Sequence, residues 1–256
     1  MSIDDLLDKG SVALDEGDIK SALKYFQQAL NQEESAEAWL LMAEAQAENG
    51  AFSAACKSLN AGLKIDPQEI DLLVALGDLY LEEGKNTAAA ETYQKVIDID
   101  PEETDAWVRK AMAHMNNDDL DSAEKCCLEA LKRDDKSTFA LNALGDIHVA
   151  CDNAESAVAY FEKAAELEPD DPQPHLSLAD LYYDADRLEE AEESCLKGLK
   201  LDASSASGYL TLGNIYLDLD RSQDAVENYE QFLRLEKSPT AKQIRDEVSA
   251  VIEGLK

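Results

Sequence analysis

Two adjacent stretches decide the fold: residues 36–69 read AEAWLLMAEAQAENGAFSAACKSLNAGLKIDPQE, and residues 70–103 read IDLLVALGDLYLEEGKNTAAAETYQKVIDIDPEE. Each is 34 residues long and ends in Ile-Asp-Pro followed by two polar residues. The same register continues through 104–137, 138–171, 172–205 and 206–239, and a slightly shorter copy occupies 3–35. A fixed period of this length is the signature of a repeat array, in which each unit packs against its neighbours. We therefore divide residues 1–239 into seven tandem repeats.

Equivalent positions, numbered from 1 to 34 within a repeat, show constant chemistry. Position 8 is always Gly or Ala and position 20 is always Ala, which lets two helix backbones approach closely, while the mostly bulky position 24 fills the remaining space. Position 15 is Gly in the first three repeats and Asp in the last four, and both residues tolerate the left-handed conformation that ends a helix. Each repeat is therefore predicted to be two amphipathic helices joined by a tight turn.

This pattern resembles the tetratricopeptide repeat (TPR) family, whose repeats have a large residue at position 4, Gly at 8, Ala at 20, an aromatic residue at 24 and Pro at 32. Trp39 and Trp107 match position 4, and Pro101 matches position 32. Cys127 and Cys195 depart from the pattern at position 24, and we expect them to loosen their repeats without breaking the register. The resemblance implies an all-α fold, a right-handed superhelical solenoid whose concave face is lined by the first helix of each repeat.

The remaining residues, 240–256, are predicted to form a C-terminal capping helix. Ser238 and Pro239 suit its N-cap and first helical position. One stripe of this helix is apolar and consists of Ile244, Val248, Val251, Ile252 and Leu255. We expect the stripe to cover the apolar flank that the last repeat of a solenoid exposes. The alternative is a helix that binds a partner.

The charge balance limits the choice of partner. The chain of 256 residues carries 55 acidic residues against 23 Lys and Arg, a net charge of −32. Nucleic acids and anionic lipids are therefore unfavourable direct partners, although adaptation to a salty cytoplasm is an alternative reason for the charge. The acidic start lacks signal-peptide character, and five cysteines with an adjacent pair, Cys126 and Cys127, indicate reduced thiols. We expect a cytoplasmic protein of undetermined oligomeric state.

No motif for catalysis, nucleotide binding or metal binding occurs, so the sequence predicts a protein that is not an enzyme and needs no cofactor or metal. The histidines stand at repeat positions where other repeats have large aromatic residues that pack between helices: His114 and His148 at position 11, and His175 at position 4. Most of the cysteines are expected to be buried apolar thiols. Cys151, at a turn between helices, leaves redox sensing as an alternative.

A candidate binding groove follows from positions 2, 5, 9 and 12, which share one helical stripe and which line the concave face in the TPR family. Positions 5 and 12 are mostly apolar and position 9 is mostly acidic. The candidate groove residues are Leu40, Glu44, Val74, Asp78, Leu81, Val108, Arg109, Met112, Met115, Asn142, Asp146, Val149, Leu176, Asp180 and Tyr183. The alternative is that the apolar residues of positions 5 and 12 only pack against neighbouring helices.

These features favour a non-enzymatic scaffold or adaptor whose groove binds a partner segment that combines Lys or Arg with Leu-like residues. Two other functions stay open. One is a cytoplasmic chaperone for a secreted or membrane-associated client, which the acidic charge and the groove methionines would suit. The other is a regulatory TPR module of an enzyme assembly, with the chemistry on another polypeptide or domain.

Overall fold

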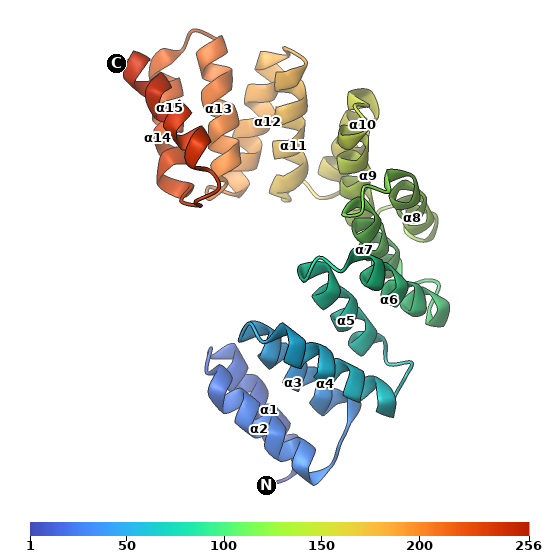
Figure 1. The fold of residues 1–256 in the computed structure, drawn as a ribbon. Coiled ribbons are helices and arrows are strands. Elements are labelled where there is room, and N and C mark those ends of the chain that lie inside the picture. The colour runs from blue at the N-terminus through green and yellow to red at the C-terminus, as the bar shows by residue number, and fades with distance from the viewer. Residues whose placement is uncertain (256) are drawn as a thin grey trace. The chain divides into compact units, whose positions relative to one another are not determined.

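The computed structural model describes residues 1–255, and within that range the chain forms fifteen α-helices and no β-strand (Figure 1). The predicted all-α class is confirmed. The helices belong to two compact units, divided between Ser137 and Thr138. The first unit contains α1 (Ile3–Asp15), α2 (Ile19–Gln32), α3 (Ala36–Glu48), α4 (Phe52–Ile65), α5 (Ile70–Glu82), α6 (Asn86–Ile99), α7 (Thr104–Met115) and α8 (Leu120–Arg133). The second unit contains α9 (Thr138–Ala150), α10 (Ala154–Leu167), α11 (Pro172–Asp184), α12 (Leu188–Leu201), α13 (Ala206–Asp218), α14 (Ser222–Leu235) and α15 (Lys242–Leu255).

The turn inside each helix pair has the left-handed residue that the sequence predicts. Gly17, Gly50 and Gly84 have φ between 69° and 76°. The aspartates that replace them have φ between 55° and 57°, and they are Asp118, Asp152, Asp186 and Asp220. The next residue closes the turn, as where the Asp119 N–H donates to the carbonyl oxygen of His114 at 3.0 Å. This bond satisfies a carbonyl at the end of the first helix, so the turn ends α7 and starts α8.

The two helices of a pair fit together through complementary volumes at positions 8 and 24. Where position 8 is Gly, position 24 is a ring, and a Cβ added to Gly145 would lie 2.5 Å from ring atoms of Phe161. The same holds for the pairs Gly10–Phe26, Gly77–Tyr93 and Gly213–Tyr229. Where position 8 is Ala, position 24 is smaller, as in Ala43–Leu59, Ala111–Cys127 and Ala179–Cys195. Both cysteines and the alanines opposite them are fully buried, with Cys127 and Cys195 each 0% exposed.

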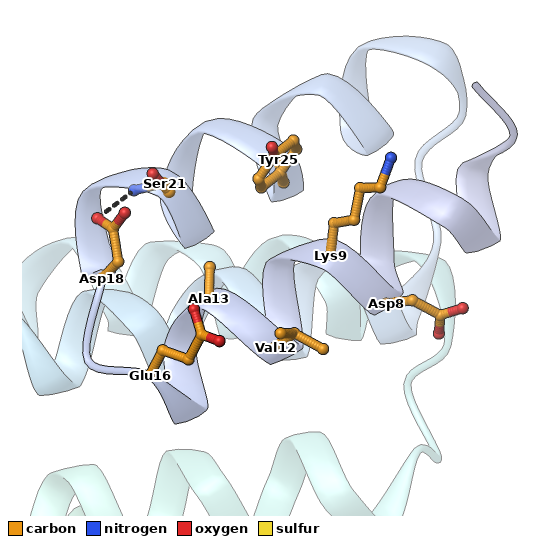
Figure 2. Close-up of a pocket in the computed structure, with 8 residues that line it drawn as sticks. All are labelled: Asp8, Lys9, Val12, Ala13, Glu16, Asp18, Ser21 and Tyr25. Carbon is orange, nitrogen blue, oxygen red and sulfur yellow. Dashed lines mark hydrogen bonds between the residues drawn. The ribbon is translucent and has the colours of Figure 1, made fainter.

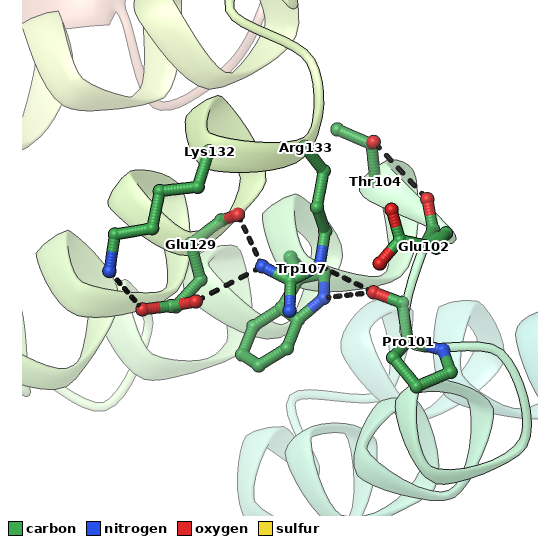
Figure 3. A network of polar contacts seen from close by, with 7 residues as sticks. All are labelled: Pro101, Glu102, Thr104, Trp107, Glu129, Lys132 and Arg133. Carbon is green, nitrogen blue, oxygen red and sulfur yellow. Dashed lines mark hydrogen bonds and ion pairs between the residues drawn. The ribbon is translucent and has the colours of Figure 1, made fainter.

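Position 4 connects α7 to the loop that precedes it, as Figure 3 shows. The guanidinium carbon of Arg133 lies 4.5 Å from the centroid of the Trp107 ring. Trp107 Nε1 and Arg133 Nε both donate to the carbonyl oxygen of Pro101, at 3.1 and 2.5 Å. Arg133 also forms an ion pair with Glu129 at 3.0 Å. The network therefore joins α7 and α8 to the end of the preceding helix pair.

The N-terminal edge of the first unit leaves an apolar side chain exposed. Val12 of α1 is 56% exposed, although it stands at position 10, which is buried in the six following repeats as Ala45, Leu79, Ala113, Ile147, Leu181 and Ile215. Figure 2 shows Val12 in an open pocket with Asp8 and Lys9 of α1, Glu16 at the C-cap of that helix and Tyr25 of α2. An apolar side chain thus lies among charged ones at this edge.

The C-terminal helix α15 packs on α14. Val248 and Ile252 are buried, Val251 and Leu255 are partly buried against the core of the second unit, and only Ile244 of the predicted stripe is as much as 36% exposed. The predicted start at Pro239 is wrong, since the helix begins at Lys242. A turn precedes it because the Lys242 N–H reaches back to the carbonyl oxygen of Pro239 at 3.4 Å, while the Ser238 hydroxyl accepts the N–H of Ala241 at 3.2 Å.

Candidate functional site

The structure places the candidate groove residues on the first helices of both units. We call the residues of α3, α5 and α7 the first-unit strip; they are Leu40, Glu44, Val74, Asp78, Leu81, Val108, Arg109, Met112 and Met115. We call the residues of α9 and α11 the second-unit strip; they are Asn142, Asp146, Val149, Leu176, Asp180 and Tyr183. The two strips belong to different compact units.

Two of the candidates are buried, and their assignment as contact residues is wrong. Val108, on α7, is 2% exposed. Asn142 is 7% exposed, and its Nδ2 donates to Asp171 Oδ2 at 3.2 Å. Asp171 is the N-cap of α11, so Asn142 connects α9 to the start of the next helix pair. At these two sites, position 5 serves packing rather than binding.

Asp78 and Arg109 are not free groove charges either. Arg109 Nη1 lies 2.5 Å from Asp78 Oδ1, and the Tyr93 hydroxyl donates to the same oxygen at 2.6 Å. Burial, and then the hydrogen bond to Asp78, raise the pKa of the Tyr93 phenol, which therefore stays protonated and keeps donating. The Asp78 carboxylate is thus largely neutralised by partners within the first unit.

In three other carboxylates of the strips, the charged form is disfavoured in the folded chain. Burial raises the pKa of Glu44, with further contributions from Glu48 and Asp71. Burial alone raises the pKa of Asp146, and burial likewise raises that of Asp180, although the latter accepts a hydrogen bond from Thr211 at 2.7 Å. Surrounding protein displaces water from these carboxylates, which disfavours their charged form. A cation placed beside them would relieve that cost.

The apolar candidates differ in how far they can contact a ligand. Met112 is 43% exposed and Val149 is 45% exposed. The remaining ones are half-buried, namely Leu40, Val74, Leu81, Met115, Leu176 and Tyr183. Leu176 is committed to packing, because a Cβ on Gly198 would lie 2.6 Å from its side chain. The Tyr183 hydroxyl donates to Asp218 at 2.9 Å. Met112 and Val149 are therefore the most accessible apolar contacts of the strips.

One exposed aromatic residue, Phe139, is not among the groove residues predicted from the sequence. Phe139, near the start of α9, is 69% exposed. It stands at position 2 of its repeat, on the same helical stripe as Asp146 and Val149. Position 2 is acidic in the first four repeats, as in Asp71 and Asp105. The aromatic residue at this position of the fifth repeat is the feature of the sequence that indicates an additional contact residue.

The histidines make packing and hydrogen-bond contacts. His148 stacks on Tyr160 with ring centroids 5.3 Å apart, and His114 Nδ1 lies 3.2 Å from an oxygen of Asp119. His175 Nε2 lies 3.2 Å from the carbonyl oxygen of Pro169, as Trp107 does from Pro101 at the equivalent place. Within residues 1–255, no three His, Cys, Asp or Glu side chains are arranged to hold a metal ion.

The cysteines are all unpaired thiols, and three of them are buried. Burial raises the pKa of Cys127 and of Cys195 to about 12, and burial also raises the pKa of Cys126 and Cys56. A raised pKa lowers the fraction of reactive thiolate. Cys151 is exposed, as its place in the turn predicts.

Of the helices that the structure describes, none combines the length and the apolar character needed to cross a membrane.

Comparison with known proteins relates the chain to repeat proteins. Residues 4–248 match a TPR family model described as the Cilia and flagella-associated protein 70 C-terminal domain. By sequence, the chain matches none of the curated proteins.

Several solved structures share the fold. A tetratricopeptide repeat protein from Parabacteroides merdae matches with a TM-score of 0.76 and 19% identity over 98% of both chains. PilF of Pseudomonas aeruginosa matches with a TM-score of 0.70 and 20% identity, over 84% of this chain and 96% of that one. A chain of the APC/C hetero-tetramer Cut9–Hcn1 matches with a TM-score of 0.73 and 15% identity, over 99% of this chain and 52% of that one.

Proposed function

Because this chain belongs to the tetratricopeptide repeat family, we propose that it is a non-catalytic scaffold that holds a segment of a partner protein against its first helices. The segment combines Lys or Arg with Leu-like residues, and neither a cofactor nor nucleic acid takes part. A structural neighbour, the Cut9–Hcn1 hetero-tetramer, shows that the fold occurs in protein assemblies. The cytoplasmic location stays a prediction from the cysteine spacing.

The observation that carries the proposal is the pairing of unneutralised carboxylates with exposed apolar side chains on the same helices. In the second-unit strip, Asp146 has no hydrogen bond or ion pair among the described residues, and it shares one helical stripe with the exposed Val149 and Phe139. The first helices of this unit, α9, α11 and α13, contain neither Lys nor Arg. A basic and apolar segment therefore complements this surface in both respects.

The two kinds of contact would contribute differently to binding. A single exposed ion pair is worth only about 0 to 1 kcal/mol, so charge alone does not give useful affinity. Burial of exposed apolar side chains, such as Met112 of the first-unit strip, or Val149 and the neighbouring Phe139 in the second unit, supplies the larger part, at about 25 cal/mol for each Å² of apolar surface removed from water. The carboxylates would select the partner and raise the association rate.

The test uses a synthetic peptide in which Leu and Arg alternate with Ser, here named the Leu–Arg peptide, and a control in which citrulline replaces Arg. Fluorescence anisotropy at several salt concentrations measures binding. We expect the Leu–Arg peptide to bind and the citrulline peptide to bind more weakly. Replacing Glu44, Asp146 and Asp180 with their amides should flatten the salt dependence, whereas Met112→Ser with Val149→Ser should weaken binding at every salt concentration. Binding that is unchanged in both variants would contradict the proposal.

A second candidate function, a chaperone, is favoured by Phe139 and Met112, because large exposed apolar side chains suit many different clients. Affinity capture from cell extract separates the two functions. A single recurrent partner indicates a scaffold, and a broad set of unfolded clients indicates a chaperone. A regulatory module of an enzyme assembly is indicated if the captured partner is an enzyme whose rate changes when this chain is added.

A further inference from the structure

The first unit contains a pit on its candidate binding surface, between α3 and α5, with a volume of about 260 Å³. Alanines form much of its wall, including Ala43, Ala47 and Ala75. Three carboxylates complete the lining, those of Glu44, Asp78 and Glu82. The pit therefore combines apolar walls with a negatively charged rim.

The pit exists because one side chain of the repeat pattern is small. Ala47 stands at position 12, where all the other repeats carry a larger apolar residue, namely Leu14, Leu81, Met115, Val149, Tyr183 and Leu217. A Leu at position 47 would extend into the space that the Ala methyl leaves open. The small side chain at position 12 is thus particular to the second predicted repeat.

The three carboxylates of the pit are not equivalent. Asp78 is already paired with the guanidinium of Arg109 and with the Tyr93 hydroxyl. Glu44 and Glu82 have no hydrogen bond or ion pair among the described residues. Burial raises the pKa of Glu44, and Glu48 and Asp71 add to the shift, so its charge is held in an unfavourable negative environment. The Asp78–Arg109 pair shows that a guanidinium fits beside this wall.

We propose that the pit is a subsite for one long basic side chain of the partner segment, Lys or Arg, with its methylene groups against Ala43, Ala47 and Ala75 and its charged end between Glu44 and Glu82. This inference rests on the proposed function and assigns it a single anchoring position. Long basic side chains suit such a place because the stem is apolar and only the tip is charged. The charge complementarity excludes an acidic or purely apolar anchor, since either would leave two carboxylates uncompensated.

The experiment replaces each Arg of the Leu–Arg peptide by citrulline, one at a time, and measures binding to the full chain. We expect citrulline at one position to weaken binding much more than citrulline at any other position. In Ala47→Leu, which fills the pit, and in the double variant Glu44→Gln with Glu82→Gln, citrulline at that position should weaken binding no more than citrulline at the others. Each variant should bind the parent peptide about tenfold more weakly than the original chain does. Ala250→Leu is the matched control, because it makes the same substitution at an exposed alanine of α15 that belongs to neither strip, and its affinity should be unchanged.

The variants are designed to fold, because Leu occupies position 12 in three other repeats and the two glutamates make no contact that the fold needs. Circular dichroism melting verifies this. If the Leu–Arg peptide binds and neither variant changes its affinity or the dominant Arg, the subsite is wrong while the proposed function stands. If the Leu–Arg peptide binds no better than its citrulline control, both inferences fail.

Discussion

At position 8 a single methyl group decides which side chain fits opposite it. A Cβ on Gly145 would lie 2.5 Å from the ring of the fully buried Phe161. We expect Gly145→Ala to destabilise the chain by about 1–3 kcal/mol, the usual cost of overpacking a core. The double variant Gly145→Ala with Phe161→Leu recreates the Ala43–Leu59 pair. It should therefore lose less free energy of unfolding than the sum of the losses of the two single variants.

Urea unfolding measures these free energies, and Gly254→Ala is the control. A Cβ at Gly254 meets nothing within 4 Å, so this change in α15 should be neutral or stabilising by up to about 1 kcal/mol. Equal effects of the alanine substitutions at Gly145 and Gly254 would contradict the volume argument.

The left-handed aspartates are a second feature of single residues. Asp152 has φ of 55°, a conformation that costs an ordinary L-residue about 1–2 kcal/mol. We expect Asp152→Ala to lower the free energy of unfolding by about 1 kcal/mol, while Asp152→Gly should restore or exceed the original stability. Thermal melting compares the two variants, and Glu155→Ala, at an exposed place in the next helix, is the control. An alanine variant as stable as the glycine variant would contradict this interpretation.

The carboxylate of Asp146 predicts a dependence of stability on pH. Burial raises its pKa above the ordinary value of 3.8, so the folded chain binds this proton more tightly than the unfolded chain does. Stability from this group therefore falls as the pH rises from that value through the folded pKa. Asp146→Asn should raise the melting temperature near neutral pH, and the gain should shrink as the pH approaches 3.8. A gain from Asp146→Asn that is the same at every pH would contradict this assignment.

At the scale of one helix, α15 is held to α14 by the buried side chains of Val248 and Ile252. Each contributes at most about 1.5–3 kcal/mol, because an extended reference chain overstates the area buried on folding. Removing residues 240–256 should expose Phe232 and its neighbours, lower the melting temperature and promote self-association. Calorimetry and light scattering measure both effects.

Point substitutions in α15 separate loss of packing from loss of the whole segment. Val248→Ser should reproduce part of the destabilisation, whereas Ile244→Ser should have little effect because that side chain is already 36% exposed. Unchanged melting and no association after the deletion would show that the helix does not protect the second unit.

For the whole molecule, stability should be divided among parts. The two compact units have separate hydrophobic cores, such as the cluster around Phe26 in the first unit and that around Phe161 and Tyr229 in the second. Contacts in a repeat array are mostly between neighbours, so cooperativity across the chain is weak. We expect the calorimetric enthalpy of unfolding to exceed the van't Hoff enthalpy. Equal values would show that the chain unfolds as one cooperative unit.

The all-α class, the turns and the positions at which the two helices of a repeat pack together follow from the sequence alone. Those features depend on residues that are close in the chain: Asp118 ends α7 through its own φ, and Gly77 meets Tyr93 within one helix pair. The 34-residue period then repeats the same local solution. The start of α15 was misplaced because the turn at Pro239 depends on a weak backbone contact that residue types do not specify.

Which candidate site residues can contact a partner depends on how the helices pack together. Asp78 and Arg109 are 31 residues apart, so their neutralisation appears only once α5 and α7 pack together. Val108 and Asn142 share the helical stripe of exposed residues but are themselves buried in the folded chain. Stripe periodicity gives the direction of a side chain from its own helix, whereas exposure, charge pairing and the empty volume beside Ala47 depend on what the adjacent helices place opposite it.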